Sequence, residues 1–406
     1  MIIEIILAIM SGIGIGIFTG ITPGVHLNLV SAITVTSAPL IILKLGVKDG
    51  AVVLCVFIIA MAITHTFLDT LPGIYLGAPD DANALSILPG HRMLLQGKGH
   101  TAVLLTLTGS LFALIIGIAM LPVFVFLMVF AYPVVHNITG FLLIILVVYL
   151  ILREKGWNKK ALCTFIVILS GTLGILVLNA PMKQPLLPLL SGMFGISTLL
   201  LSLLEKSVLP KQEFESSIEV ERNEFNQTTI GSSIMGFIAA FLPGFGSSQA
   251  AILSLSVIKN ITTAGFLILI GGINTANMLV SVGSAYALDK ARNGAIVAVN
   301  ELAGVVDYKL MLLLVIAGLI AAGIAFIITI KMSKVFCNIL TKVNYAAVII
   351  AVMLFVLCLA VFFDGWMGLL VLFVSTALGI MVQELGIGKN HLMSCLIIPV
   401  IFFFVL

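Results

Sequence analysis

Two copies of one helix-breaking pattern interrupt apolar stretches of this chain, and they lie about 220 residues apart. The first occupies residues 16–28 (GIFTGITPGVHLN) and the second residues 236–249 (GFIAAFLPGFGSSQ). Water is absent inside a bilayer, so a Pro-Gly break at that depth is tolerated only where protein buries it or where it lines a cavity. Two unrelated Pro-kinked helices are the alternative. The recurring glycines and the polar residues after each break favour a repeat whose broken helices form a binding site.

The composition identifies the solvent in which the chain folds. Hydrophobic residues make up 61% of the 406 residues and charged residues 9%, unlike a soluble domain. Apolar stretches of about 20 residues predict roughly ten to fourteen membrane segments, the first of which begins at the N-terminus and is not a removed signal. The expected fold is therefore an all-α polytopic protein of the cell membrane. A net charge of +3 gives no reason to expect nucleic acid as a partner.

A polar stretch, residues 205–227, divides the chain into two halves of similar length. We expect residues 1–204 and residues 228–406 to form two transmembrane repeats, each with a Pro-Gly-broken re-entrant helical hairpin. Lys and Arg collect in the polar stretch and near residues 153–160 and 331–342, which places these segments in the cytoplasm. Counting crossings from them predicts inverted repeats if both hairpins turn back; parallel repeats are the alternative.

Sequence motifs for catalysis or metal binding are not found. The five cysteines are dispersed singly, without C-x-x-C spacing, and we interpret them as small buried hydrophobic residues. The motifs H-E-x-x-H, G-x-S-x-G and G-x-x-x-x-G-K-[ST] do not occur. We therefore expect no enzyme activity, no cofactor and no bound metal. Transport would then draw on a gradient of Na+ or H+ as the coupling ion.

Several ordered motifs resemble those of one known family. The Gly-x-x-x-Gly-x-x-Pro-Gly opening at residues 16–24 is followed by residues 77–99, then by residues 188–197 (PLLSGMFGIS), and by residues 236–246 at the start of the second half. In this order they are similar to the TctA family, the large membrane subunit of the tripartite tricarboxylate transporters. The resemblance spans most of the chain. It implies a multi-pass permease for carboxylated metabolites, driven by an ion gradient, with a small membrane subunit and an extracytoplasmic binding protein as partners.

Three features depart from the family pattern. Asp80 and Asp81 stand where the family has small residues, and their charge would repel a tricarboxylate. The first break continues as residues 25–28 (VHLN), where the family tends to have small residues. The second half is also shorter than is usual in the family. These departures suit a short, single-component member that works without the binding protein.

The residues at and after the two breaks form the predicted substrate site. A broken membrane helix presents unpaired N–H groups at the start of one half-helix, which favour anions, and unpaired carbonyl groups at the end of the other, which suit Na+. Hydroxyl and amide side chains add hard oxygen ligands. Alternatively, Ser and Thr bond back to their own helices. The predicted substrate-binding residues are Thr22, Pro23, Gly24, His26, Asn28, Pro243, Gly244, Gly246, Ser247, Ser248 and Gln249.

Candidates for the coupling ion lie downstream of the breaks. His65 and Asp69 are four residues apart on one helix face, where they could pair and relay protons. Asp69 precedes a Pro-Gly turn, so a position in water is the alternative. The corresponding positions of the second half are Asn274, Thr275 and Asn277, whose amide and hydroxyl groups could bind an ion without carrying a charge. The predicted coupling-ion residues are His65, Asp69, Asn274, Thr275, Asn277 and Glu301.

Basic residues that could meet an anionic substrate are few. Arg92, Lys98 and Arg292 are those within the motif regions, and their alternative role is to fix topology in cytoplasmic loops. We expect solvated helix ends, without chemistry, at Asp364, Glu384, Lys389 and His391.

The sequence therefore predicts a secondary active transporter for a small organic anion, expected to be a carboxylate. Access would alternate around a midplane site formed by the two hairpin tips. This interpretation is compatible with four kinds of partner: the bilayer, the anion, the accessory subunits named above, and a second copy of the chain in a homodimer. Two alternatives stay open. One is a translocase of an anionic lipid carrier such as polyprenyl phosphate, and the other is a non-transporting scaffold or intramembrane enzyme.

Overall fold

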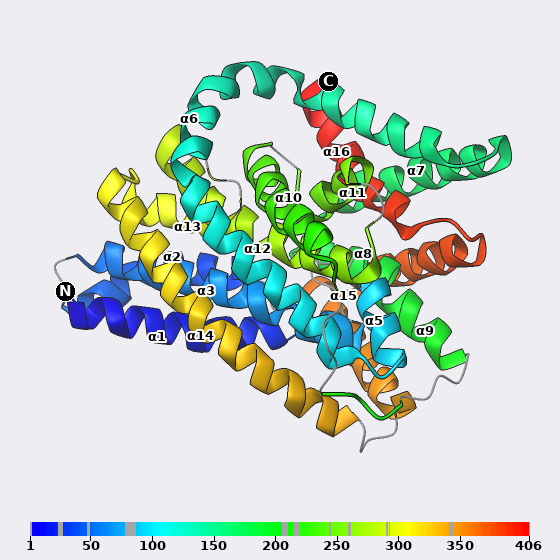
Figure 1. Ribbon diagram of the computed structural model, residues 1–406, viewed down its shortest axis with the longest axis horizontal. Helices are drawn as coiled ribbons and strands as arrows, with labels where there is room; N and C mark the ends of the chain where they lie inside the picture. The colour runs from blue at the N-terminus through cyan, green and yellow to red at the C-terminus, as the bar shows by residue number, and fades with distance from the viewer. Residues whose placement is uncertain are drawn as a thin grey trace.

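The fold is built from helices alone in the part of the chain that the structure describes, so the all-α prediction is confirmed. Figure 1 shows long helices crossing near the centre of the molecule. The computed structural model describes residues 2–22, 27–46, 49–77, 87–204, 210–214, 220–242, 245–258, 261–289, 291, 293–340 and 345–405.

The order of the helices follows the apolar runs of the sequence. A π-helix, η1 (Ser191–Ile196), lies between α8 and α9, and a 3-10 helix, η2 (Lys389–Met393), precedes α16. The α-helices are α1 (Ile2–Ile21), α2 (Leu27–Leu45), α3 (Gly50–Leu68), α4 (Thr70–Leu76), α5 (Ile87–Leu95), α6 (Gly99–Arg153), α7 (Trp157–Leu178), α8 (Leu186–Leu190), α9 (Ser197–Leu204), α10 (Arg222–Phe241), α11 (Ser247–Val257), α12 (Thr263–Leu288), α13 (Gly294–Ala303), α14 (Tyr308–Leu340), α15 (Tyr345–Glu384) and α16 (Ser394–Val405).

Among the described residues, eight helices are long and apolar enough to cross a membrane, and four shorter apolar helices accompany them. The multi-pass membrane prediction is therefore confirmed. Helices α6 and α15 have 55 and 40 residues, about two to three times the length that one crossing needs. Helix α15 consists of two segments joined at Gly365, whose φ of 58° favours glycine. The number of ten to fourteen segments stays a prediction.

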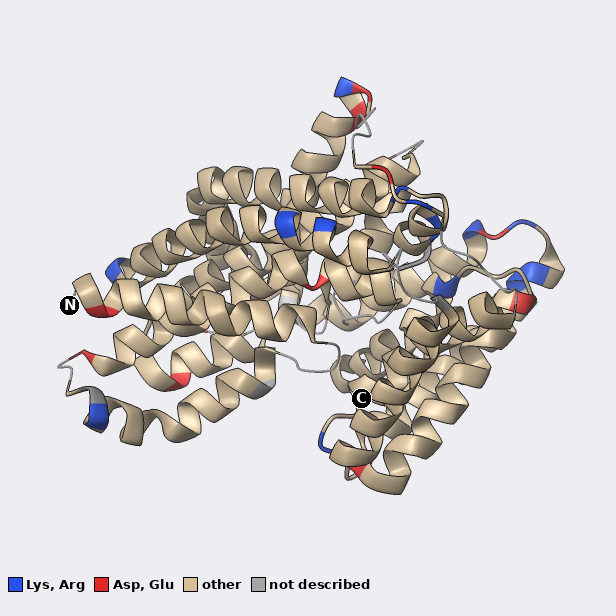
Figure 2. Cartoon of the chain, turned by 90° about the horizontal axis from the view of Figure 1, so that it is seen from below, with Lys and Arg blue, Asp and Glu red and all other residues tan. Residues whose placement is uncertain are grey.

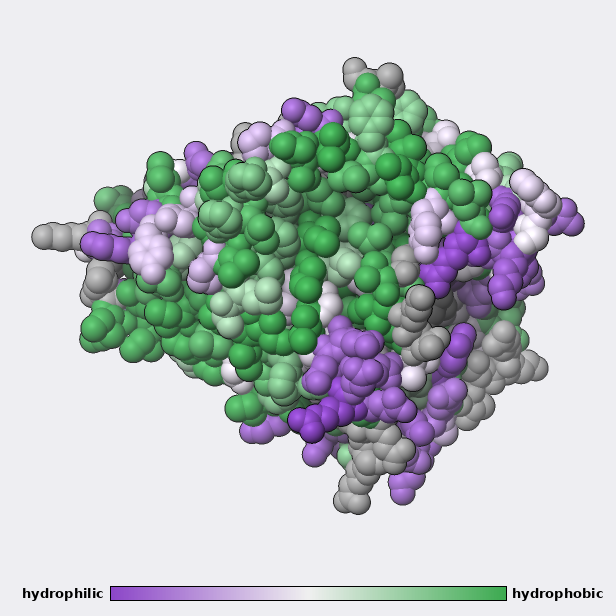
Figure 3. Space-filling model, turned by 45° about the horizontal axis from the view of Figure 1, so that its top comes forward, coloured by the Kyte–Doolittle hydropathy of each residue, from purple (hydrophilic) through white to green (hydrophobic). Residues whose placement is uncertain are grey.

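The outer surface suits lipid. Large apolar side chains are exposed on the long helices, among them Phe130 of α6 and Phe362 of α15, each with 78% of its surface exposed. Figure 3 shows hydrophobic residues over most of one face and hydrophilic residues gathered in patches toward its lower and right-hand edges. In Figure 2, most charged residues lie in loops or near helix ends. This distribution is the one that a bilayer around the bundle requires.

Helices α1 and α3 of the first half lie side by side and run in the same direction. A Cβ atom on Gly12 would lie 2.9 Å from the Cβ of Ala60, and one on Gly20 would lie 2.7 Å from the Cβ of Leu68. The residue numbers rise together along the contact, so the helices are parallel. Helix α2, which joins them, must therefore return toward the end at which α1 begins.

Helices α10 and α12 of the second half also lie side by side. Gly272 of α12 lies against Ser232 of α10, and Gly236 of α10 lies against Ala276 of α12. Here too the residue numbers rise together along the contact. Helices α10 and α12 are therefore parallel, and α11 between them returns toward the start of α10.

Packing between the halves is extensive. Helix α6 runs along α12 in the same direction, with Gly109 against Ile268 and Gly117 against Leu279. These close approaches use glycine because the neighbouring helix occupies the space that a Cβ atom would need. Helix α6 of the first half is therefore packed on a helix of the second half.

Helix α14 of the second half runs along α3 of the first half. Gly318 lies against Ile63, and Tyr75, which follows α3, is hydrogen-bonded to Ser333 (Oη to Oγ, 2.7 Å). His100, at the start of α6, contacts the same serine (Nδ1 to Oγ, 2.7 Å), near the far end of α14. Helices α1, α3 and α14 therefore run one way, and α6, α10 and α12 run the opposite way.

Part of the polar stretch between the halves is helical, and part of it is packed on the bundle. Helix α10 begins at Arg222, so residues 222–227 are already helical. Gln212, also in this stretch, is buried against the first half, where its Oε1 accepts a hydrogen bond from the backbone N–H of Gly99 (2.9 Å). The stretch is thus partly packed on the bundle, and the division of the chain into two repeats stays a prediction.

Candidate functional site

A cavity of about 430 Å³ lies where residues that flank the two breaks come together. We call it the hairpin cavity. It receives side chains from α2 and α3 of the first half and from α11 and α12 of the second half. Its polar lining residues are Asn28, His65, Thr66, Asp69, Ser247, Gln249, Asn274, Asn277 and Asn293, and Gly246 also lines it.

Helices α3 and α12 meet at this cavity through buried polar contacts. Asn274 Nδ2 donates a hydrogen bond to Asp69 Oδ2 (2.8 Å), and Thr275 Oγ1 donates to Thr66 Oγ1 (3.3 Å). Each contact joins one half of the chain to the other. A buried carboxylate is costly unless it is hydrogen-bonded, so the Asn274 amide stabilises Asp69 in this position.

The second break places the start of α11 at the cavity. The backbone N–H of Gly246 donates to Gln249 Oε1 (3.0 Å), and Asn277 Nδ2 of α12 donates to Ser247 Oγ (3.1 Å). The first contact caps the helix, and the second fixes the helix start against α12. The positive end of the α11 dipole therefore points to a cavity whose polar lining consists of amides and hydroxyls together with His65 and Asp69.

The predicted substrate-binding residues are placed unevenly by the structure. Asn28 lines the hairpin cavity, as do Gly246, Ser247 and Gln249. Thr22 is half-buried and Ser248 is buried, and neither is a lining residue. The remaining predicted residues of this group lie outside the described ranges; they are Pro23, Gly24, His26, Pro243 and Gly244.

The predicted coupling-ion residues divide into two groups. Asp69 is 2% exposed and lies at the wall of the cavity. His65 is also buried and contacts Thr19 through Nδ1 (3.1 Å to Oγ1). Both line the cavity with Asn274 and Asn277, whereas Thr275 lies behind the lining. Glu301, on α13, is exposed and is not a lining residue.

The sequence reasoning missed two polar residues of the cavity, Thr66 and Asn293. Thr66 is an unremarkable hydroxyl in an apolar run, and no local signal distinguishes it. Asn293 directly precedes the apolar helix α13, and its Oδ1 accepts a hydrogen bond from the backbone N–H of Ile296 (3.0 Å). An asparagine before an apolar run is the N-cap signal, which could have found this residue.

Replacing Asn293 by alanine is expected to destabilise the protein by about 1 kcal/mol, because the N-cap of α13 is lost. Asn293→Ser should recover most of the stability, since serine caps a helix equally well. Unfolding of the purified variants in detergent would be followed against temperature. Equal losses for Asn293→Ala and Asn293→Ser would show that the cap is not the cause.

Two expected helix ends prove to be buried, so that expectation is wrong for Lys389 and His391. Lys389 is 4% exposed, and its Nζ donates to the hydroxyl groups of Ser197 (2.9 Å) and Thr198 (2.7 Å). His391 is 1% exposed, and its Nε2 lies 3.1 Å from Glu154 Oε1. Burial is tolerated because Lys389 Nζ and His391 Nε2 each find polar partners in the fold.

The basic residues of the motif regions lie apart from the hairpin cavity. Arg92 lines a second cavity, Lys98 is exposed, and Arg292 lies outside the described residues. Glu154, Cys163 and His391 form a group that could hold a metal ion, with ligand atoms within 4.8 Å of one another. The sequence analysis missed this group because its members are far apart in the chain.

Comparison with known proteins agrees with this architecture. The chain is 26% identical, over 412 residues, to an uncharacterised protein of Methanocaldococcus jannaschii, and the match covers 98% of each chain. No solved structure matches it significantly. The model of the tripartite tricarboxylate transporter TctA family, a transporter family, matches residues 6–394. This match covers nearly the whole chain, which therefore belongs to the TctA family.

Proposed function

We propose that this protein is a secondary active transporter for a small organic anion of the carboxylate class, with the hairpin cavity as its substrate site. One observation carries the proposal: polar residues flanking both breaks and on the two following helices, Asn28, Ser247, Asp69 and Asn274 among them, line a single cavity. Membership of a transporter family supports transport, and the family description names tricarboxylates. The family match also favours a carboxylate over a lipid carrier.

Alternating access between two inverted repeats is the proposed mechanism. The opposite directions of the α1–α3 and α10–α12 pairs support it, because inverted repeats place equivalent hairpins on opposite sides of the site. The hydrogen bonds of Asp69 with Asn274 and of Thr66 with Thr275 lie at the contact between the halves. A rocking motion of one half against the other would rearrange these contacts around the substrate.

The charge of the cavity supports coupling to a cation. Asp69 is the one carboxylate among its described lining residues, and none of them is Lys or Arg. An anion entering beside Asp69 would be repelled unless a cation entered with it. Carboxylate, amide and hydroxyl oxygens suit Na+, whereas His65 and Asp69 together suit a proton. We therefore propose co-transport of Na+ or H+ with the anion.

Uptake by proteoliposomes tests the proposal. The purified protein would be reconstituted alone, and uptake of radiolabelled citrate, succinate and malate measured with an inward Na+ gradient, an inward proton gradient or neither. We expect one carboxylate to accumulate only when one of the gradients is imposed. Accumulation would also show that the single chain suffices. The uptake experiment would then be done again with a candidate membrane subunit and binding protein added, which tests for a multi-component transporter. The absence of uptake both with and without these proteins would contradict the proposal.

Replacing Ser247 by alanine is expected to raise the half-saturating substrate concentration about two- to tenfold, because a hydrogen bond contributes about 0.5–1.5 kcal/mol. Ser254 provides the matched control on the same helix. It is buried, but its Oγ bonds back to the Ala250 carbonyl (2.8 Å) and it does not line the cavity. Ser254→Ala should leave the half-saturating concentration unchanged. Equal effects of the two substitutions would argue against a role of Ser247 in binding.

A further inference from the structure

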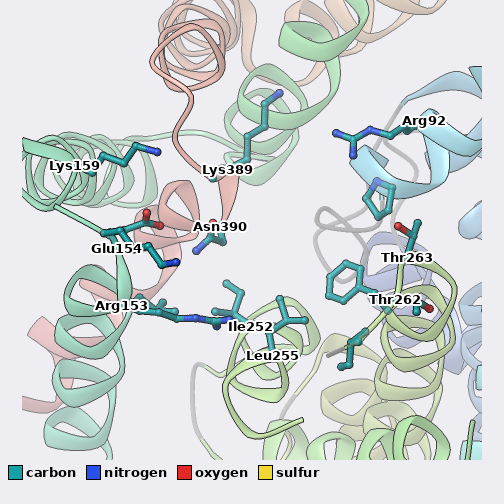
Figure 4. A pocket seen from close by; sticks show the side chains of 16 residues that line it. Arg92, Arg153, Glu154, Lys159, Ile252, Leu255, Thr262, Thr263, Lys389 and Asn390 are labelled. Atoms are coloured by element: carbon teal, nitrogen blue, oxygen red, sulfur yellow. The ribbon is translucent and has the colours of Figure 1, made fainter. Parts of the chain in front are cut away.

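A second cavity, with a volume of about 700 Å³, lies apart from the hairpin cavity. We call it the basic cavity. Figure 4 shows Arg92 on one side, facing Arg153 and Lys159 on the other. Both halves of the chain contribute to it: α5 and the α6–α7 turn come from the first half, and α11, α12 and η2 come from the second half. Its charged lining residues are Arg92, Arg153, Glu154, Lys155, Lys159 and Lys389.

Among the described residues, few acidic groups balance the positive charge of the basic cavity. Glu154 is the one carboxylate among the described lining residues, and His391 Nε2 lies 3.1 Å from its Oε1. Lys389 is hydrogen-bonded to two hydroxyl groups. The other four basic side chains of the lining form no hydrogen bond or ion pair with the described residues. Like charges around one cavity repel, and a bound anion would relieve this repulsion. The four side chains are those of Arg92, Arg153, Lys155 and Lys159.

The position of the basic cavity is that of a membrane boundary. It lies where α6 ends and where α7 and α12 begin, and its walls include the apolar side chains of Leu150, Ile252 and Phe266. Trp157, at the start of α7, is 85% exposed, as is usual for tryptophan at the level of lipid headgroups. Basic side chains beside apolar walls at this depth match a charged headgroup joined to an apolar body.

The helix end at this cavity is already occupied. Glu224 Oε1 accepts hydrogen bonds from the backbone N–H (2.7 Å) and the hydroxyl (2.8 Å) of Thr262, the N-cap of α12. The positive end of the α12 dipole therefore interacts with the Glu224 carboxylate. Recognition of an anion in the basic cavity has to rest on the Arg and Lys side chains, which prefer phosphate and carboxylate oxygens.

We propose that the basic cavity binds a phosphate-type oxyanion at the membrane boundary, carried by the headgroup of an anionic lipid or present as a free ion. Arg92 and Arg153 hold the oxyanion from opposite sides, and Lys155 and Lys159 neutralise its charge. The site contacts α11, the returning limb of the second hairpin, through Ile252. It is separate from the substrate site proposed above, so the two can be tested independently.

A matched pair of triple variants tests this site in the purified full-length protein. Arg153→Gln, Lys155→Gln and Lys159→Gln together remove three charges from the cavity. The control removes three charges elsewhere, by Lys160→Gln, Lys331→Gln and Lys334→Gln, since none of these lysines lines the cavity. Size-exclusion chromatography verifies that both triples are folded, and Lys159→Gln alone is the milder substitute if the first triple is not.

Two arms distinguish the source of the oxyanion. In the lipid arm, native mass spectrometry measures retention of phosphatidylglycerol and cardiolipin added to detergent-solubilised protein. In the free-ion arm, thermal unfolding is followed with added pyrophosphate or inorganic phosphate, since a ligand that binds the folded state raises the midpoint.

We expect saturable binding in at least one arm, weakened at least tenfold by the cavity triple and unchanged by the control triple. Retention in the lipid arm alone identifies a headgroup as the ligand, and stabilisation in the free-ion arm alone identifies a soluble anion. No saturable binding in either arm, or equal weakening by both triples, would overturn the proposal.

Discussion

Asp69→Asn is expected to lower the initial rate of gradient-driven uptake by about ten- to a hundredfold, because hydrogen bonds and contacts to a charged group contribute about 1.5–3 kcal/mol. Asparagine has nearly the same shape, so its side-chain oxygen can still accept the bond from Asn274 that Asp69 accepts at 2.8 Å. What is lost is the one carboxylate among the described lining residues. Uptake by proteoliposomes, measured over a range of Na+ concentrations and pH values, would record the loss.

The dependence on the coupling ion distinguishes this role from a structural one. If Asp69 binds the cation, the variant should lose most of its response to the imposed gradient while its unfolding temperature in detergent stays close to that of the wild type. Glu384→Gln removes an exposed carboxylate at the end of α15 and should change neither quantity. Full gradient-driven uptake by Asp69→Asn would falsify the assignment of this residue to the coupling ion.

Gly109→Ala is expected to have the largest effect on folding, about 3 kcal/mol of destabilisation, with loss of monodisperse protein. A Cβ atom at this position would fall on the backbone carbonyl of Ile268 in α12. A backbone group cannot rotate away as a side chain can, so α6 and α12 would have to separate along their contact. Thermal unfolding and size-exclusion chromatography of the purified variant measure the effect.

Gly323 supplies the matched control, because it also lies within a long helix, α14, but a Cβ atom there meets nothing within 4 Å. Gly323→Ala should be neutral or stabilising by up to about 1 kcal/mol, as alanine favours a helix over glycine. If Gly109→Ala were as stable as Gly323→Ala, the close packing of α6 on α12 described above would be incorrect.

Local sequence patterns drew attention to several residues that the structure places at the hairpin cavity. A Pro-Gly pair inside an apolar run has few uses in a membrane, and the polar residues that follow it stand out against their surroundings. Asn28 and Ser247 were found in this way. Aligning the two halves then identified Asn274 beside the region of His65 and Asp69, and the structure brings all five residues to one cavity.

Contacts between distant parts of the chain were not predictable in the same way. Lys389 is separated by 192 residues from Ser197, and His391 by 237 residues from Glu154. The local sequence predicts solvated helix ends at both positions. A charge between two apolar helices has the same sequence signature whether it faces water or a neighbouring hydroxyl group. Only the packing of η2 against the first half decides between them, and that packing has no local signal.

The hydrogen bond between Asp69 and Asn274 has a consequence for the synthesis of the chain. The two residues are 205 positions apart, and α3 and α12 are among the most buried membrane helices of the fold. At about 5–20 residues per second, a ribosome would need roughly 10–40 s to reach Asn274 after completing Asp69. During that interval the carboxylate has to be shielded from lipid by something other than its final partner. Because of the order of translation, the first half depends on the insertion machinery to shield Asp69 until the second half has been made.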